Sequence, residues 1–211
     1  MRDFATGFTH DVLPAFQRGV LAYTYKGIPC LKCPIDLAIY TKLIWDIQPR
    51  TLIEIGTNRG GSALWFADIL AAAGIDCPVF SFDRDSAVEF SDPRISFQQA
   101  DANALAESLP GPWLAGLPHP WLVIEDSAHT YETTLAVLRF FTGAMIPGDL
   151  IVVEDGVIDD LGLTEHYGGG PNRAVGEFLT AHPTAFRLLE DYCDMFGRNL
   201  TYNPNGYLMK T

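Results

Sequence analysis

The sequence predicts a doubly wound α/β fold, in which helices cover both faces of a mostly parallel sheet. Two observations predict it. Strand-like and helix-like segments alternate along the chain, and the strand-like segments are continuous apolar runs. Continuous apolar runs indicate strands that are covered on both faces, and their alternation with helices favours parallel connections. We therefore expect one sheet with helices on either side.

Seven segments have the character of strands, which predicts a seven-stranded sheet. Most are short apolar runs close to a glycine, a proline or an acidic residue, which are typical of strand ends. In chain order they are 51–56, 78–83, 94–101, 121–126, 147–155, 186–192 and 206–210.

The helices are predicted from apolar residues that recur every three or four positions. Pro34 suits the first turn of a helix, and Gly74 suits the position just after a helix end. The predicted helices span residues 11–22, 61–73, 134–145 and about 172–181, and a further helix is predicted to open at Pro34 and to include Leu37, Tyr40 and Ile44. Residues 1–48 are expected to form an N-terminal helical extension, and residues 49–211 a single domain.

Composition excludes several classes of function. The chain has 211 residues, of which 48% are hydrophobic and 19% charged, enough apolar material for one well-packed domain. With 14 basic and 26 acidic residues, the formal net charge is −12. An acidic chain without a basic run is a poor partner for a phosphate backbone, so we expect no nucleic-acid partner. Cations suit this charge better.

Nothing in the sequence predicts a membrane segment or a signal peptide. No run reaches the roughly 18 apolar residues of a membrane helix, and the N-terminal stretch carries acidic residues in place of an apolar core. Cys30 and Cys33 form a C-x-x-C without a second cysteine or histidine pair, so incidental cysteines are favoured over a zinc or redox site. We expect a cytoplasmic protein.

Acidic residues stand at or near the end of every strand in the predicted parallel part of the sheet. In such sheets, ligands bind outside the carboxyl ends of the strands. One acidic strand end is ordinary turn chemistry, but five in register indicate a binding site. The acids are Glu54, Asp83, Asp101, Asp126 and the pair Glu154–Asp155.

The turn after the first strand, "EIGTNRGGS", suits a ligand with a cationic part. Its glycines let the backbone approach a ligand closely, but it matches neither the dinucleotide nor the triphosphate fingerprint. Glu54 would repel an anion and attract an amino group. Asp83 can bind ribose hydroxyls and would reject a 2′-phosphate. A nucleoside with a cationic, amino-acid-like part meets these conditions, and S-adenosylmethionine is such a molecule.

Asp126, Glu154 and Asp155 predict a site for a divalent cation. The spacing of 28 and 29 residues leaves room for one helix and a return strand, so the two strand ends should be neighbours. Three carboxylates there would repel one another, and a hard cation such as Mg²⁺ relieves that repulsion. His129, three residues after Asp126, is the candidate for the base that accepts a proton from a hydroxyl group.

The sequence resembles the class I S-adenosylmethionine-dependent methyltransferases, which have a Rossmann-like fold. More narrowly, it is similar to the cephalosporin hydroxylase and rhamnosyl O-methyltransferase group over roughly residues 24–210. The segments that carry this resemblance are "PIDLAIY", "LIEIGTNRGGSALWFA", "FSFD", "VIEDSAHTY", "PGDLIVVEDG" and "GGGPNRAVGEF". The acidic pattern also matches the metal-dependent catechol O-methyltransferases, in which a lysine stands where this chain has His129.

The resemblance implies a role for each matched residue. His129 would be the catalytic base, and Asp126, Glu154 and Asp155 would hold Mg²⁺. The cofactor would be bound by Glu54, Gly56, Thr57, Gly60, Ser62, Asp83, Asp101, Ala102 and Asp126. The implied activity is a Mg-dependent O-methyl transfer to a hydroxyl of a sugar, a phenol or a natural-product scaffold. It also suggests self-association.

The glycine-rich loop 164–173 is expected to cover the acceptor, with His166, Tyr167 and Arg173 in contact with it. Two other interpretations stay open at this point. One is an NAD-dependent oxidoreductase on the same kind of sheet, although the dinucleotide fingerprint is broken. The other is a non-catalytic binding protein that has this fold.

Overall fold

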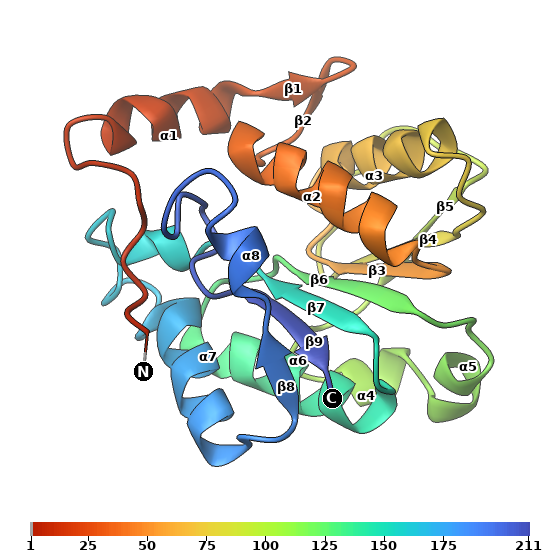
Figure 1. The fold of residues 1–211 in the computed structure, drawn as a ribbon. Helices are drawn as coiled ribbons and strands as arrows, with labels where there is room; N and C mark the ends of the chain where they lie inside the picture. Colours follow the sequence, from red (N-terminus) through yellow and green to blue (C-terminus); the bar gives the residue numbers. More distant parts are fainter. Residues whose placement is uncertain (1) are drawn as a thin grey trace.

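A computed structural model of the chain describes residues 2–211 and has a seven-stranded sheet at its centre (Figure 1). The strand order is β5-β4-β3-β6-β7-β9-β8. The strands are β3 Thr51–Ile55, β4 Val79–Asp83, β5 Ile95–Gln99, β6 Trp121–Glu125, β7 Leu150–Val153, β8 Phe186–Leu188 and β9 Tyr207–Lys210. Strands β3 to β7 pair in parallel, and β9 is antiparallel to both β7 and β8. The predicted mostly parallel sheet is confirmed.

Helices cover both faces of this sheet, as predicted. In Figure 1, α2 and α3 lie on one side of the sheet, and α6 and α7 lie on the other. The helices are α1 Leu13–Ala22, α2 Pro34–Ile47, α3 Gly61–Ala72, α4 Leu105–Ser108, α5 Gly111–Ala115, α6 Tyr131–Ala144, α7 Gly170–Ala181 and α8 Glu190–Cys193, with a short 3-10 turn η1 Gly156–Ile158. The division at residue 48 stays a prediction.

Side chains along each central strand alternate between two cores. On β6, Leu122 and Ile124 face the core beneath α2 and α3, whereas Val123 belongs to the core on the opposite side. The same alternation on β3 and β7 puts Glu54 and Glu154 in phase with the α2–α3 side. The alternation therefore decides which acidic side chains at the strand ends point toward α2 and the segment before it, where Lys32 and Tyr40 lie.

The short helices α4 and α5 and the turn η1 are not among the predicted elements, and two further differences concern strands. The strand expected over 186–192 stops at Leu188, and α8 follows it. Glu190 and Asp191 lie in the first turn of that helix, where acidic side chains favour a helix start. The second difference is a short hairpin, β1 Thr24–Tyr25 and β2 Ile28–Pro29, which is not among the predicted strands. Its two-residue turn, Lys26–Gly27, has positive φ at both positions, the conformation that hairpin turns favour.

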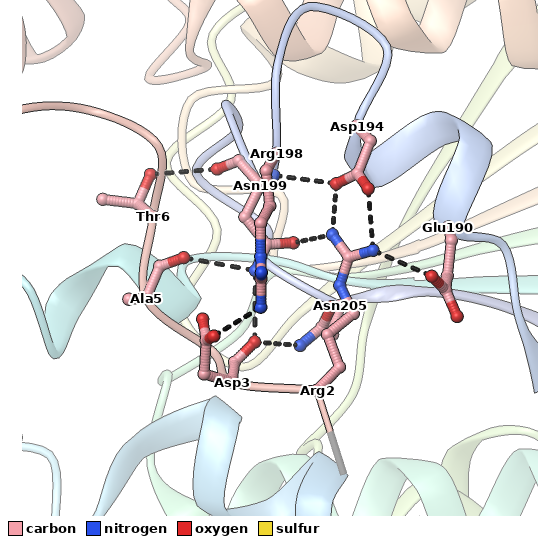
Figure 2. Close-up of polar contacts among 9 residues, drawn as sticks. All are labelled: Arg2, Asp3, Ala5, Thr6, Glu190, Asp194, Arg198, Asn199 and Asn205. Carbon is pink, nitrogen blue, oxygen red and sulfur yellow. Dashed lines mark hydrogen bonds and ion pairs between the residues drawn. The ribbon is translucent and has the colours of Figure 1, made fainter.

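The N-terminal residues fasten the loop that precedes β9 (Figure 2). The Arg2 guanidinium donates to the carboxylates of Asp194 and Glu190. The side-chain amides of Asn199 and Asn205 both donate to the carbonyl of Asp3. The loop between Asn199 and Asn205 is therefore held from outside by a segment almost 200 residues away in sequence.

The same loop is held from inside by Asp36 on α2. This carboxylate is buried and accepts hydrogen bonds from the hydroxyls of Thr201 and Tyr207 and from the backbone N–H of Tyr202. Burial raises its pKa, and these donors oppose the rise. Asn203 in this loop accepts the backbone N–H of Asp155 with its side-chain oxygen. The packing of α2 and of the N-terminal segment against the loop therefore helps to position the acidic edge of the sheet.

Candidate active site

A pocket of about 590 Å³ opens at the carboxyl ends of the parallel strands. Its walls come from the turn after β3, the ends of β4 and β6, the segment after β5, and Asp155 after β7. The N-terminal region and the segment 157–167 close the remaining sides. This is the position at which doubly wound sheets bind ligands, and its size suits a small-molecule ligand.

Most of the predicted site residues line this pocket. They are Gly56, Thr57, Ser62, Asp83, Asp101, Ala102, Asp126, His129, Asp155 and Tyr167. Five predicted residues are not among its lining, namely Glu54, Gly60, Glu154, His166 and Arg173. Their roles stay predictions. The contacts that each of the five residues makes outside the pocket are described below.

Gly56 brings the ends of β3 and β6 into close contact. It has φ +113°, and a Cβ placed on it would lie 2.0 Å from the carbonyl oxygen of Asp126. The Asp126 N–H in turn donates to the carbonyl of Ile55, at 2.9 Å. A side chain at position 56 would therefore push apart the two strand ends that carry the site. Gly60 differs in kind, because a Cβ there would meet the rings of Phe90 and Phe97.

Asp83 is a fixed carboxylate at the end of β4. Its Oδ2 accepts from the backbone N–H of Asn58 at 2.8 Å, and its Oδ1 accepts from the N–H of Asp85 at 2.9 Å. Asp101 and Ala102 line the same side of the pocket. A carboxylate held in this way at the second strand end has the position from which such folds bind ribose hydroxyls.

Glu54 lies beneath the pocket floor. It is fully buried, and its Oε2 accepts from the Ser81 hydroxyl at 2.5 Å. Its Oε1 has no hydrogen-bond partner among residues 2–211. Burial raises the pKa of Glu54, while Lys32 and the hydroxyls of Ser62 and Ser81 lower it. A buried carboxylate oxygen without a partner, next to a pocket-lining serine, suits a cationic ligand group.

Asp126, His129 and Asp155 converge at the acidic edge of the sheet. One ligand atom from each lies within 4.8 Å of the other two, close enough to surround a metal ion. His129 Nε2 is 3.4 Å from Asp155 Oδ2, and His129 Nδ1 is 4.0 Å from Asp126 Oδ1. Two carboxylates at an open pocket wall suit a divalent ion, and an imidazole beside them can either join them as a ligand or remain free as a base.

The backbone at this edge is strained at two non-glycine positions. His129 and Asp155 have φ values of +55° and +59°, in the left-handed region. Such conformations cost free energy and cluster at functional sites. The Asp155 N–H donates to the side-chain oxygen of Asn203 at 3.0 Å, which links this residue to the loop before β9.

Glu154 lies one residue deeper and is held by a lysine that the sequence analysis did not consider. Lys32 Nζ lies 2.6 Å from Glu154 Oε1 and 2.5 Å from Asp126 Oδ2. The Tyr40 hydroxyl donates to the same Oε1 at 2.7 Å. Burial raises the pKa of Glu154, Asp126 adds to that rise, and Lys32 opposes it.

Lys32 and Asn203 were missed because their signals are not local. Lys32 lies between the two cysteines of "CLKCP", 94 residues before Asp126. It belongs to none of the motifs from which the site was predicted. Asn203 is part of a turn-like "NPNG". Their roles follow from tertiary contacts with the strand ends, made by the segment between β2 and α2 and by the loop before β9, and sequence spacing does not reveal those contacts.

The three predicted acceptor contacts lie in different surroundings. The Tyr167 ring meets His129 edge-on, with 5.8 Å between ring centroids, and lines the pocket. His166 packs against Tyr167. Arg173 pairs with Glu177 and lies over the ring of Tyr131, 4.3 Å from its centroid.

The sequence matches a known family. The family model described as rhamnosyl O-methyltransferase/CmcI matches residues 18–211. The rhamnosyl O-methyltransferase of Mycobacterium tuberculosis (strain ATCC 25618 / H37Rv) is 29% identical over 195 residues, which cover 89% of this chain and 78% of the relative. That of Mycobacterium leprae (strain TN) is 29% identical over 192 residues and covers 89% and 82%.

Solved structures agree on the fold. A structure described as CmcI with Mg and SAM is 25% identical, has a TM-score of 0.71, and covers 90% of this chain and 77% of that chain. The MycE methyltransferase of the mycinamycin biosynthetic pathway, solved with Mg, SAH and mycinamycin VI, is 21% identical with a TM-score of 0.53. It covers 69% of this chain and 41% of that chain. The predicted Rossmann-like fold is confirmed.

Replacing Gly56 should destabilise the protein severely. For Gly56→Ala we expect the free energy of unfolding to fall by about 3 kcal/mol or more, because the new Cβ overlaps the Asp126 carbonyl and the backbone is strained. The matched control is Gly74→Ala, which also has positive φ but open space around it. It should cost about 1 kcal/mol. Equal losses in urea unfolding would contradict the close-contact explanation.

Proposed function

Because the chain belongs to the rhamnosyl O-methyltransferase/CmcI family, we propose that it transfers a methyl group from S-adenosylmethionine to a hydroxyl group of a small molecule, with the help of a divalent cation. The observation that carries this proposal is the acidic edge of the pocket, where Asp126, His129 and Asp155 converge. It stands beside a wall that suits a nucleoside cofactor.

The cofactor wall supports S-adenosylmethionine over a dinucleotide. Glu54 and Ser62 would border the methionine part of the cofactor, Asp83 would bind the ribose, and Asp101 with Ala102 would lie near the adenine. The buried Glu54 carboxylate and the pocket-lining Asp83 attract a sulfonium and an ammonium, and they repel a pyrophosphate. S-adenosylmethionine, when bound, supplies the methyl group.

The acidic edge supports a divalent cation. Asp126, Glu154 and Asp155 would hold it, with water or acceptor oxygens at the remaining positions. When bound, such an ion lowers the pKa of a coordinated hydroxyl. The Asp126 and Asp155 side chains are partly exposed at the pocket wall, whereas Glu154 is buried and held by Lys32. Mg²⁺ is the ion of choice, because hard carboxylate oxygens suit it.

His129 is proposed as the base that accepts the hydroxyl proton. His129 Nε2 lies 3.4 Å from Asp155 Oδ2, so the imidazole stands at the acidic edge where the acceptor hydroxyl would bind. The backbone of residue 129 is left-handed, and the Nδ1 atom of its ring lies 4.0 Å from Asp126 Oδ1. Tyr167 packs edge-on against the imidazole and limits its rotation.

The acceptor is proposed to be a sugar, phenol or natural-product hydroxyl, bound beneath the loop 164–173. Tyr167 would contact it directly, and His166 and Arg173 from further out. The proposed setting is the cytoplasm, and the four free, buried cysteines agree with a reducing compartment. Self-association is proposed from the family resemblance. Among residues 2–211, no helix is both long enough and apolar enough to cross a membrane.

Cofactor binding is tested by thermal unfolding with ligands. S-adenosylhomocysteine should raise the melting temperature, because a ligand that binds only the folded state stabilises it. NADH at the same concentration should leave the melting temperature unchanged. The reverse pattern would favour an oxidoreductase, and no shift with either ligand would favour a non-catalytic protein.

Metal dependence is tested by Asp155→Ala together with chelation. The variant should lose turnover of a hydroxyl acceptor, because a carboxylate at the pocket wall is removed from the proposed ion site, yet it should still bind S-adenosylhomocysteine. EDTA should abolish the turnover of the wild-type protein. Asp191→Ala, an exposed change on α8, serves as the control. Turnover that persists in excess EDTA would show that no metal is needed.

His129→Ala should lower kcat by about 10²–10⁴-fold, the usual contribution of a positioned base. Its affinity for the divalent ion should stay close to that of the wild type, which separates the role of a base from that of a metal ligand. His10→Ala, in the exposed N-terminal segment, is the matched histidine control. A loss of less than about tenfold in kcat would rule out His129 as the base.

A further inference from the structure

Lys32 is the buried cation of the acidic edge. It lies between β2 and α2, and its side chain is 2% exposed. The other three lysines of the chain, Lys26, Lys42 and Lys210, are all more accessible. The flanking Cys30 and Cys33 are buried, and the Lys32 N–H donates to the Cys30 carbonyl at 2.8 Å, so the backbone that presents the lysine is fixed.

The side chain is an ammonium ion. Its contacts are those of a cation, at 2.5 Å from Asp126 Oδ2 and 2.6 Å from Glu154 Oε1. A buried Glu154 needs such a partner, because an uncompensated buried charge is strongly destabilising.

The ammonium takes the place that a metal ion would need. Glu154 Oε1 already accepts from both Lys32 and the Tyr40 hydroxyl. The ligand atoms that converge within 4.8 Å belong to Asp126, His129 and Asp155, and Glu154 is not among them. Two cations of like charge also repel each other when they share one carboxylate in a buried site. Glu154 can therefore bind either the lysine ammonium or the metal ion strongly, but not both at once.

We propose that Lys32 is a built-in counter-ion that competes with the divalent cation for Glu154 and Asp126. The inference rests on the proposed function, which puts a divalent ion at these carboxylates. In the metal-free protein the ammonium holds the ends of β6 and β7 together. When the ion binds, Lys32 gives up Glu154 and its head group turns toward the pocket that it already lines.

This competition has two physical consequences. Lys32 places one positive charge among the three carboxylates and offsets part of their mutual repulsion, so it stabilises the edge when no metal is bound. The ion must displace or face an existing positive charge, which weakens its binding. Lys32 is thus a positioning residue that sets the affinity for the ion.

The main experiment measures Mg²⁺ and Mn²⁺ affinity by isothermal titration calorimetry, with no cofactor or acceptor present. Lys32→Met keeps the length of the side chain and removes its charge, so the ion should bind about tenfold more tightly or better. Lys42→Met is the matched control, because Lys42 pairs with Asp46 on the surface and changes the net charge equally. Unchanged or weaker binding by Lys32→Met overturns the inference.

A double-mutant cycle with Glu154→Gln separates direct competition from long-range charge. If Lys32 and the ion compete for Glu154, the tightening caused by Lys32→Met should become smaller in the Glu154→Gln background, where only the competition for Asp126 is left. If the full tightening persists there, competition for Glu154 is excluded. If neither wild type nor Lys32→Met binds an ion, the inference and the metal part of the proposed function both fail. Ion binding that Lys32→Met leaves unchanged overturns the inference alone.

The wild-type protein offers a test that needs no destabilising variant. Four lysines give a simple ¹⁵Nζ spectrum, and the buried Lys32 ammonium should give the one slowly exchanging signal of the metal-free protein. Titration with Mg²⁺ should shift that signal or abolish it through faster exchange with water. A Lys32 signal that stays unchanged at saturating Mg²⁺ would overturn the competition.

Discussion

The site depends on how negative charge is tolerated at one edge of a buried sheet. Asp126, Glu154 and Asp155 follow two adjacent parallel strands, so their carboxylates cannot move far from one another. Charges in such a place require a compensating cation or a shifted protonation state. The protein supplies one cation of its own, Lys32, and leaves an open side at Asp155 and His129. The chemistry that we propose uses the charge that remains.

The fold holds this edge from several directions. Gly56 permits the close approach of β3 and β6, and Asn203 accepts the N–H of the strained Asp155. The loop that carries Asn203 is fixed from inside by Asp36, and from outside by the N-terminal segment (Figure 2). The N-terminal residues therefore belong to the support of the site, although they lie far from it in sequence. A preorganised edge of this kind spares the reaction the cost of arranging its charges.

The sequence was informative where the pattern is periodic. Apolar runs predicted all seven strands, and the 28-residue gap after Asp126 predicted that β6 and β7 are neighbours, which the pairing confirms. The strand that begins at residue 186 is shorter than predicted. The segment "LLEDYC" is apolar enough for a strand, but it also places Leu189 and Cys193 one helical turn apart, and in the structure its residues Glu190–Cys193 form α8. Boundaries of this kind depend on packing that a local pattern does not contain.

The candidate site could be predicted only in part, for a similar reason. The acids at the strand ends were visible because topology alone brings them together. Side-chain direction was not visible: Glu54 and Glu154 are in phase with the α2–α3 side and are buried there, rather than open to the pocket. Lys32 comes from a segment whose only local signal is a pair of cysteines, so its place among the acids follows from tertiary contact alone.

Charge also gives a reason for product release in the proposed reaction. The pocket wall carries Asp83, Asp101, Asp126 and Asp155, and a sulfonium cofactor enters this field favourably. Methyl transfer removes the positive charge from the sulfur, so the same wall holds the product less strongly than the substrate. A dinucleotide would meet the opposite condition, because its phosphates would face these carboxylates throughout. In the proposed reaction, the acidity of the pocket wall thus favours a sulfonium cofactor over a dinucleotide and favours release of the product.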